Sequence, residues 1–254
     1  MSNNNLSIVQ LKKKYPLNTK GKNKLKREYK IALKNISLEL ENGLYGLLGP
    51  NGAGKSTLIN LITMGDIPNS GYIQWNGKNI KKLNKQYRRI LGYMPQQQNL
   101  YENFSGKQFL QYMCALKEIP RDTIDSEIKR CADAVNLSDR LNQRLGTYSG
   151  GMKQRLLAAS AIIGNPKLLI FDEPTAGLDP KERVRLRTFM KELSSDSIVI
   201  TATHVVSDVE SVADKIILLK EGSIIDIAPV NELIEKYAPG HSLEQVYLNI
   251  FGEE

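Results

Sequence analysis

The segment Gly-Pro-Asn-Gly-Ala-Gly-Lys-Ser at residues 49–56 constrains the fold of this chain more than any other. It fits the Gly-x-x-x-x-Gly-Lys-Ser/Thr pattern of a phosphate-binding loop, in which glycines let several backbone N–H groups point at one anion. Lys55 would bring positive charge to the outer phosphates, and the Ser56 hydroxyl can hold Mg²⁺. The pattern therefore predicts a nucleotide site formed by Asn51, Gly52, Ala53, Gly54, Lys55, Ser56 and Thr57.

The segments around this loop support that interpretation. Residues 43–48 are typical of a short buried strand that enters the loop, and residues 57–62 are typical of a helix that leaves it. A helix that begins at Lys55 would present its positive end to a bound anion. An ordinary glycine-rich turn does not need this arrangement, so the flanks disfavour that alternative.

Composition excludes several classes of protein. With 254 residues, 41% of them hydrophobic, the chain can form one sizeable domain or two closely joined subdomains. It has no run of roughly 20 apolar residues, so we expect no membrane span, and its polar start predicts no secretory signal. Cys114 and Cys131 lie far apart without a Cys-x-x-Cys pair, which is typical of a reduced cytosolic protein with inert thiols.

The net charge of +8 is concentrated near the N-terminus. Residues 1–30 hold nine Lys and Arg against one acidic residue, so the rest of the chain is neutral. A neutral body argues against a basic channel through the fold, and we expect no nucleic-acid partner. The basic stretch is either a solvated loop or a contact for anionic lipid headgroups or an acidic partner loop. Its lysines for such a contact are Lys20, Lys22, Lys24 and Lys26.

Short alternating segments predict strands and hairpins. Residues 31–40 place Ile36, Leu38 and Leu40 on one face, and residues 8–14 alternate weakly, as an edge strand can. Asn76-Gly77 and Glu221-Gly222 predict two hairpin turns. The strands that they join are residues 72–75 and 78–80, and residues 216–219 and 223–227.

Helical patterns and further short strands fill the rest of the chain. Residues 105–145 are mostly helical in pattern, with a break at Pro120. Residues 167–171 and 197–200 predict parallel strands that are covered on both faces. Between them, Asp179 is a predicted N-cap with proline at the first helical position. The apolar residues at helical spacing in the first helix are Phe109, Leu110, Met113, Cys114 and Leu116.

Two carboxylates end the strand predicted at residues 167–171. An acid at the end of a buried strand can stand beside the Mg²⁺ of a nucleotide that a neighbouring loop holds. Because adjacent strand residues face opposite ways, we expect Asp172 and Glu173 to have different tasks. Asp172 is the predicted Mg²⁺ partner, directly or through water, and Glu173 is the predicted group that polarises the attacking water.

Residues 148–155, Tyr-Ser-Gly-Gly-Met-Lys-Gln-Arg, carry another specific signal. Ser149 is a good N-cap for a helix over residues 152–163, and Gly150 and Gly151 permit close backbone approach. The segment predicts a second anion site at a helix start. A soluble domain rarely needs two such sites for one nucleotide, so we expect two chains to share each nucleotide.

Together, residues 49–57, 149–155 and 169–179 resemble the ATPase subunit of an ABC transporter. Residues 92–96 resemble the Q-loop of that family, and Thr203-His204 resembles its switch histidine. The resemblance covers nearly the whole chain. It implies an α/β fold, with a P-loop NTPase (RecA-like) core, an antiparallel β subdomain and an inserted α-helical subdomain.

The resemblance also implies a division of the chain. Residues 1–227 would form the ABC ATPase domain, with the helical subdomain at about 97–160 and the basic insertion at about 16–30. Residues 228–254 would form a short C-terminal helical tail. Tyr148 departs from the Leu that is commoner in the family, which is a mild change because Ser149 and the glycines carry the phosphate contacts there.

A mechanism follows from the family. Two domains close head to tail around two ATP molecules, and Ser149 and Gly151 of one chain, beside Gly150, touch the terminal phosphate that the other chain holds. Gln96 would sense Mg²⁺ and the water, Asp179 would sit across the dimer seam, and His204 would contact the terminal phosphate. The expected cofactors are ATP and Mg²⁺. The expected catalytic residues are Glu173, His204 and Gln96, and the expected metal residues are Ser56, Gln96 and Asp172.

The aromatic residue that stacks on adenine has two candidates. In the family it follows the first strand, and Tyr15 fits that place after residues 11–14. An apparent insertion of about a dozen residues follows before Ile31. Tyr29 is therefore a rival to Tyr15.

The resemblance predicts the energy-supplying subunit of a transporter. A separate membrane permease would provide the pore, and the chain would lie at the cytoplasmic face of the membrane through that permease. Residues 242–247 resemble the tail of bacterial exporter ATPases for drugs, peptides or lantibiotic immunity, which favours export of a drug, peptide or lipid-like substrate. The cargo, and the choice between two copies and two different ATPases, stay open.

Two other classes of protein fit the sequence less well. A soluble ABC-type ATPase acting on ribosomes or DNA would usually carry paired cassettes or a long coiled-coil insertion, and the sequence has neither. A GTPase switch would carry Asn-Lys-x-Asp, and the nearest matches, at residues 23–26 and 84–87, lack the Asp.

Overall fold

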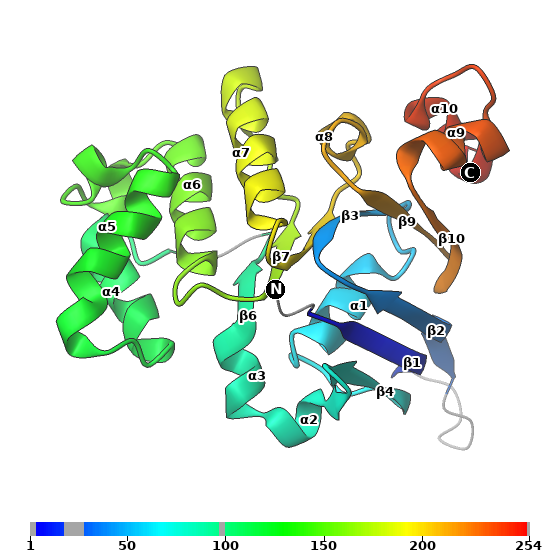
Figure 1. Cartoon of the computed structure of the whole chain (residues 1–254), viewed down its shortest axis with the longest axis horizontal. Helices are drawn as coiled ribbons and strands as arrows, with labels where there is room; N and C mark the ends of the chain where they lie inside the picture. The colour runs from blue at the N-terminus through cyan, green and yellow to red at the C-terminus, as the bar shows by residue number, and fades with distance from the viewer. Residues whose placement is uncertain (1–3, 18–27, 97–99, 253–254) are drawn as a thin grey trace.

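The computed structural model describes residues 4–17, 28–96 and 100–252. At its centre is a six-stranded sheet with the order β10-β9-β3-β8-β7-β6 (Figure 1). Its strands pair in parallel, except that β10 pairs antiparallel with β9. Nearly every residue of β3, β7 and β8 is buried, which confirms the expectation of strands covered on both faces. The bounds are β3 Gly43–Leu48, β6 Leu91–Met94, β7 Leu168–Asp172, β8 Ile198–Ala202, β9 Lys215–Lys220 and β10 Ser223–Ala228.

A second, antiparallel sheet has the order β2-β1-β4-β5. Because β1 pairs with both β2 and β4, the prediction of an edge strand at residues 8–14 is wrong. The alternation there is weak because Gln10 has a φ of 48° and interrupts the register. Beyond it, the buried positions change from Leu6 and Ile8 to Leu11 and Lys13. The bounds are β1 Leu6–Pro16, β2 Tyr29–Leu40, β4 Ser70–Trp75 and β5 Lys78–Asn79.

Both predicted hairpin turns are confirmed. Asn76 and Gly77 have φ values of 47° and 75°, and Glu221 and Gly222 have values of 47° and 74°. Positive φ at both central positions is the primed geometry that matches the twist of the joined strands. The second strand of the first hairpin is shorter than predicted, because Ile80 begins a helix.

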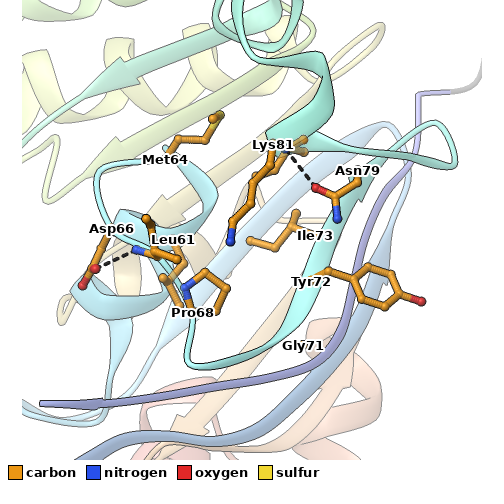
Figure 2. Close-up of a pocket in the computed structure, with 11 residues that line it drawn as sticks. Leu61, Met64, Asp66, Pro68, Gly71, Tyr72, Ile73, Asn79 and Lys81 are labelled. Carbon is orange, nitrogen blue, oxygen red and sulfur yellow. Dashed lines mark hydrogen bonds between the residues drawn. The ribbon is translucent and has the colours of Figure 1, made fainter.

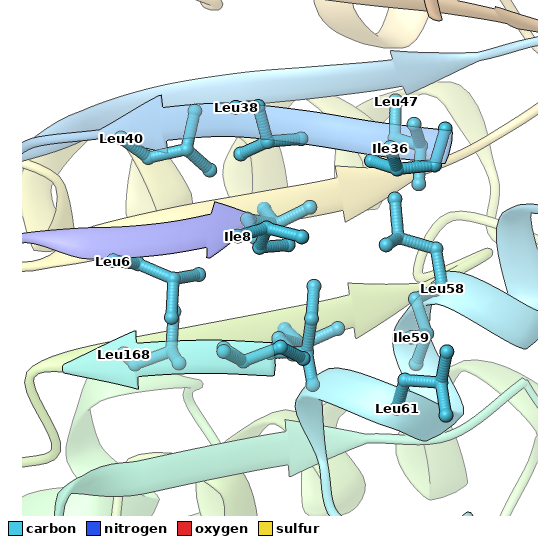
Figure 3. Packing of buried hydrophobic residues seen from close by; sticks show 14 of the residues in the cluster. Leu6, Ile8, Ile36, Leu38, Leu40, Leu47, Leu58, Ile59, Leu61 and Leu168 are labelled. Carbon is cyan, nitrogen blue, oxygen red and sulfur yellow. The ribbon is translucent and has the colours of Figure 1, made fainter. Parts of the chain in front are cut away.

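One apolar core fills the space between the two sheets and the helix α1 (Lys55–Ile62). In Figure 3, Ile36, Leu38 and Leu40 of β2 point toward the same interior as Leu58 and Ile59 of α1. The shared face predicted for these three β2 residues is confirmed. This packing fixes the position of α1, and therefore of the loop before it.

Three helices, α4 (Gly106–Leu116), α5 (Ile124–Ala134) and α6 (Gly150–Ala161), gather on one side of the molecule (Figure 1). They form a separate apolar cluster that includes Phe109, Leu110 and Cys114. Leu116 does not share their face and is 61% exposed, because two residues beyond Cys114 a helix has turned to its opposite side.

The helix α6 begins and ends two residues earlier than predicted. Ser149 caps it as expected, accepting a hydrogen bond from the Met152 N–H at 3.2 Å. Gly150 and Gly151 therefore belong to its first turn, since the N-cap position fixes where the helix starts. The helix stops before Ile162.

The remaining helices connect or cover the sheets. Asp179 caps α7, with Pro180 at its first position, and both predictions are confirmed. The last two helices pack against the side of β9 and β10 (Figure 1). The bounds are α2 Ile80–Leu83, α3 Lys85–Ile90, α7 Pro180–Leu193, α8 Ser207–Glu210, α9 Val230–Tyr237 and α10 Leu243–Phe251. The lysines proposed for anionic lipid, Lys20, Lys22, Lys24 and Lys26, lie outside the described residues.

Candidate functional site

The predicted phosphate loop joins β3 to α1, and α1 begins at Lys55 as expected. Gly52 and Gly54 have φ values of 82° and 112°, which other residues rarely adopt. At Gly54 a Cβ would also come within 2.8 Å of the Ala32 carbonyl oxygen. The loop therefore needs glycine at residue 54 for both its conformation and its packing.

A pocket of about 240 Å³ lies over this loop. Most residues predicted to bind or hydrolyse nucleotide line it, although they come from several distant segments. Ala53 does not line it: its side chain is buried, and its carbonyl accepts a hydrogen bond from the Gly222 N–H at 2.8 Å. The predicted residues that line the pocket are Tyr15, Asn51, Gly52, Gly54, Lys55, Ser56, Thr57, Gln96, Asp172 and Glu173.

The sheet order explains how these segments meet. β3 is separated from β7 by β8, and all three strands are parallel. Their carboxyl ends therefore lie at one edge of the sheet, which is where open α/β sheets bind ligands. The phosphate loop follows β3, Glu173 follows β7, and His204 lies two residues beyond β8.

In the pocket, Lys55 interacts electrostatically with two acids, Asp172 and Glu173. The Lys55 ammonium group donates to the Gly49 carbonyl at 2.5 Å and to the Pro50 carbonyl at 3.1 Å. Burial lowers the pKa of Lys55, while Glu173 and Asp172 oppose that change. Burial raises the pKa of Asp172, Glu173 adds to the rise, and Lys55 opposes it. A cation bound beside Asp172 would relieve this repulsion.

Glu173 and Asp172 line the same pocket, so the expectation that they face opposite ways is wrong. The strand ends at Asp172, and Glu173 has a φ of 51°, which breaks the strand alternation. The side chain of Glu173 is buried. One carboxylate oxygen accepts from Thr203 Oγ1 at 3.3 Å, and the other lies 2.8 Å from His204 Nδ1. Positive φ at a glutamate stores strain, which the surrounding contacts must hold.

The residues around Asp172 fit a magnesium ion that is held together with phosphates. Mg²⁺ prefers oxygen ligands and is usually bound by one or two carboxylates plus substrate phosphates. Ser56, Gln96 and Asp172 offer a hydroxyl, an amide and a carboxylate oxygen to one pocket. In the part of the chain that the structure describes, no cluster of three or more His, Cys, Asp or Glu could hold a metal by itself.

Tyr15 and Tyr29 lie on the paired strands β1 and β2, and only Tyr15 of the two lines the pocket. The Tyr15 hydroxyl donates to Asp66 at 2.8 Å, and the Lys13 ammonium group lies 4.9 Å from its ring centre. Sequence reasoning did not find Asp66, which also binds Lys13 at 2.6 Å. No sequence pattern relates β1, which carries both partners of Asp66, to the loop after α1, which carries Asp66 itself.

Lys30 and Ala32 of β2 also line the pocket, and the sequence prediction missed both. Lys30 is the register partner of Tyr15, so the pairing of β1 with β2 brings it to the pocket. Lys30 and Ala32 lie two residues apart on one strand, and residues with this spacing share a face. That spacing was the sequence signal that could have indicated their common position.

The predicted second anion site lies elsewhere. Ser149, Gly150, Gly151 and Asp179 are absent from the described lining of the nucleotide pocket. A Cβ on Gly150 would meet no described atom within 4 Å, and Gly150 does not have positive φ. Nothing within the described chain therefore explains glycine at this helix start, where its flexibility costs stability. Asp179 is exposed at the start of α7.

Tyr148 has a structural role beside this segment. It is 5% exposed, its hydroxyl donates to the Arg140 carbonyl at 2.8 Å, and burial raises its pKa. A Cβ on Gly106 would come within 2.4 Å of that hydroxyl oxygen. Glycine at the start of α4 thus makes room for a tyrosine ring.

A further pocket, of about 290 Å³, lies between α1 and the hairpin of β4 and β5 (Figure 2). Its walls are mostly apolar, including Leu61, Met64 and Ile73, with Lys81 extending among them. Asp66, which binds Tyr15, belongs to its lining. None of the residues predicted for the nucleotide site lines it, so it is separate from that site.

Comparison with known proteins gives the family. A family model described as ABC transporter matches residues 33–176. The chain belongs to the ABC transporter family. The matched segment holds the phosphate loop, Gln96, the segment from Ser149 to Gly151, Asp172 and Glu173. The chain therefore carries the ATP-binding ATPase domain of that family.

Relatives extend the match beyond that segment. The chain is 39% identical over 194 residues to an uncharacterized ABC transporter ATP-binding protein, YxlF, of Bacillus subtilis, covering 76% of this chain and 64% of that protein. It is 37% identical over 216 residues to ABC transporter A family member 1 of Dictyostelium discoideum, covering 85% of this chain and 25% of that protein. The chain thus spans about a quarter of the length of this second relative.

A solved structure shares the fold. A dimeric ATP-binding cassette in a post-hydrolysis state, bound to ADP and Pi, aligns with a TM-score of 0.77 at 24% identity, covering 88% of this chain and 98% of that one. The P-loop ATPase fold predicted from the sequence is confirmed. Within the residues that the structure describes, no helix is both long and apolar enough to cross a membrane.

Proposed function

We propose that this chain binds and hydrolyses ATP, with Mg²⁺, to power a separate membrane permease, and that two ATPase chains form its sites. The division into an ATPase domain at 1–227, with a helical part at about 97–160 and an insertion at about 16–30, and a tail at 228–254 belongs to this proposal. The observation that carries it is that two groups of predicted phosphate-binding residues do not share one pocket. One group lines a pocket, and the other is open to solvent.

The open group supports a composite site. The helix α6 offers its first turn, a serine cap and a glycine at residue 150 that no described neighbour requires. Helix N-termini attract anions, and a helix start without a side chain lets a phosphate approach the backbone closely. If a second molecule brings its own nucleotide to Gly150, the approach of that nucleotide explains why residue 150 is a glycine.

Each residue then has a role in the proposed reaction. Lys55 and the backbone of the loop bind the outer phosphates of ATP, and Tyr15 stacks on adenine. Ser56, Asp172 and Gln96 would hold Mg²⁺, which neutralises phosphate charge when bound. Glu173 orients and polarises the attacking water as general base, and His204 contacts the terminal phosphate.

The contact between Glu173 and His204 supports these two roles. A buried carboxylate placed 2.8 Å from an imidazole nitrogen has a fixed direction, which a general base requires. Thr203 holds the other carboxylate oxygen. Ser149 and Gly151 of the second chain, beside Gly150, would approach the terminal phosphate from the opposite side, and Asp179 would lie at the seam.

The permease would dock near the helices that surround the Q-loop. β6 leads directly into the segment of Gln96, and Leu116 is exposed beside a pocket that also includes Arg88 and Arg89. Arg89 already pairs with Glu118 at 2.7 Å, so the exposed leucine and Arg88 would be the groups that meet a short amphipathic helix with an acidic residue. Export of a drug, peptide or lipid-like substrate and a position at the cytoplasmic face of the membrane belong to this proposal.

Affinity purification from the native membrane tests this function. The account predicts that the tagged chain recovers a multi-spanning membrane protein, and that ATP hydrolysis rises when that protein is present. A Leu116→Glu variant should lose the membrane protein while keeping ATP binding. Recovery of ribosomes or DNA with the wild-type chain, and of no membrane protein, would instead support the soluble ABC-type ATPase.

A further inference from the structure

Asp208 in α8 is a buried carboxylate outside the nucleotide pocket. It is 3% exposed, and it accepts a hydrogen bond from Thr175 Oγ1, which is also buried. The Nη1 atom of Arg187 lies 3.9 Å from Oδ1 of Asp208. A buried carboxylate with one neutral donor and a distant cation is costly compared with apolar side chains of the same size. Local folding alone therefore does not account for an acid at this position.

Thr175 lies close to Glu173 in the segment that joins β7 to α7. The Glu173 N–H donates to the Ala202 carbonyl at 2.8 Å, and the Leu178 N–H donates to the Thr175 carbonyl at 3.1 Å. The bond from Thr175 to Asp208 joins this segment to the helix that follows His204.

A second connection joins the same two segments. Thr203 Oγ1 donates to Glu173 and accepts from the Val205 N–H at 3.0 Å, while His204 contacts the other oxygen of Glu173. The contacts therefore form a closed circuit, with Glu173 and His204 at one end and Thr175 and Asp208 at the other.

The helix α7 is tied to this circuit as well. Arg187 Nη1 donates to the Ser207 carbonyl at 2.7 Å, immediately before Asp208. Asp179, which caps α7, belongs to the surface proposed to meet the second chain. A displacement of α7 would therefore reach α8 through Arg187 and reach Glu173 through Thr175.

We propose that Asp208 is a positioning residue. Through Thr175 and Arg187 it holds the segments after β7 and β8 in the register that keeps Glu173 beside His204. This inference rests on the proposed function, in which Glu173 and His204 act on ATP. It adds a route by which closure of two chains at Asp179 orients the general base.

Thr175→Val tests the proposal, because valine has nearly the shape of threonine but cannot donate to Asp208. The expected result is a fall in kcat on the order of 10- to 100-fold, since small misplacement of a catalytic group has effects of this size. The KM for ATP, and ATP-dependent dimer formation in a Glu173→Gln background, should change by less than about twofold. Thr175→Ser should restore kcat.

The matched control is Thr188→Val in α7, whose hydroxyl donates to the Val184 carbonyl at 3.1 Å on an exposed face. It should keep the wild-type kcat. Wild-type kcat in Thr175→Val, or an equal loss in Thr188→Val, would overturn the proposal.

A readout without turnover separates this proposal from the proposed function. The chain has two histidines, so a His241→Asn background leaves one imidazole NMR signal, that of His204. Thr175→Val should shift this signal, and Thr188→Val should not. An unchanged His204 signal would overturn the inference even if the wild-type chain hydrolyses ATP. If the wild type does not hydrolyse ATP, the proposed function fails, while the NMR signal still reports on the contacts.

Asp208→Asn provides a second variant in case Thr175→Val does not fold. Asparagine keeps an acceptor for Thr175 but removes the charge that faces Arg187. We expect the His204 signal to move in the same direction by a smaller amount, and kcat to fall by several-fold. A folded Asp208→Asn chain with wild-type kcat and an unmoved His204 signal would contradict the proposal.

Discussion

The phosphate loop and the start of α6 are the two anion sites predicted for this chain, yet their surroundings differ. The loop is enclosed by residues from several strands, and its glycine at position 54 is required by conformation and by the contact with Ala32. At Gly150 neither requirement exists within the described residues. The first feature is thus explained by its own fold, whereas for the second we propose contact with another molecule.

Of these variants, Lys55→Ala is expected to lose the most activity, because it removes a partly buried cation from the phosphate loop. ATP hydrolysis should fall by on the order of 10²-fold or more, and ATP affinity should fall with it. Turnover assays and calorimetric titration with ATP measure both. Normal turnover would show that the loop does not bind the nucleotide.

Ser149→Arg addresses the open feature and should separate binding from turnover. A long cation at the start of α6 blocks approach of a second chain but leaves the loop of its own chain intact. We expect hydrolysis to fall by roughly 10²-fold, with monomer ATP affinity unchanged in the same titration. A matched control is Ser242→Arg, which changes the serine cap of α10 in the same way. Equal losses in both variants would show that the cap is only structural.

Tyr15→Ala tests whether the nucleotide site extends from the phosphate loop to the ring of Tyr15. Loss of a ring that stacks on a base costs about 1–3 kcal/mol, so the Kd for ATP should rise roughly 5- to 150-fold. Tyr29→Ala is the control, since both rings are exposed to a similar degree and each lies beneath a lysine. A larger loss in Tyr29→Ala would transfer the role to that residue.

The smallest expected effect is on stability, and it concerns the contact between the group of helices α4, α5 and α6 and the segment that leads into β6. Lys117, at the end of α4, donates to the Arg88 carbonyl at 3.0 Å and to the Leu91 carbonyl. Burial lowers the pKa of Lys117 from 10.5 to about 8. Between these values the unfolded chain holds a proton that the folded chain has lost, so this residue makes stability rise with pH.

Lys117→Met removes that dependence. The free energy of unfolding of the wild type, minus that of the variant, should therefore increase from pH 7.5 to about pH 10. Urea titrations at several pH values measure it, with Lys85→Met as the control, because Lys85 is an exposed partner of Glu118. A difference that stays constant or decreases with pH would contradict the assigned shift.

The sequence predicted those features that depend on neighbouring residues. Both hairpin turns, the caps at Ser149 and Asp179 and the start of α1 at Lys55 are local patterns, and each was confirmed. The weak alternation of β1 was misread, because one residue with positive φ changed which positions are buried. A pattern with period two cannot reveal a bulge without its partner strands.

The missed features depend on tertiary contacts. Asp66 reaches Tyr15, and Asp208 reaches Thr175, across long separations in sequence. Glu173 faces the same pocket as Asp172 because its backbone leaves the strand conformation, which strand periodicity could not predict. The residues of the phosphate loop were found because one short segment holds them all.

Sedimentation of the Glu173→Gln chain across a range of concentrations, with and without ATP, tests most directly whether the two features meet between molecules. With Glu173 as the proposed general base, the variant should bind ATP without hydrolysing it, and should therefore sediment as one chain without ATP and as two chains with ATP and Mg²⁺. Adding Ser149→Arg to it should restore the single-chain species. A Glu173→Gln chain that stays single at saturating ATP and high concentration, while the wild type hydrolyses ATP at a rate per chain independent of dilution, would contradict the account.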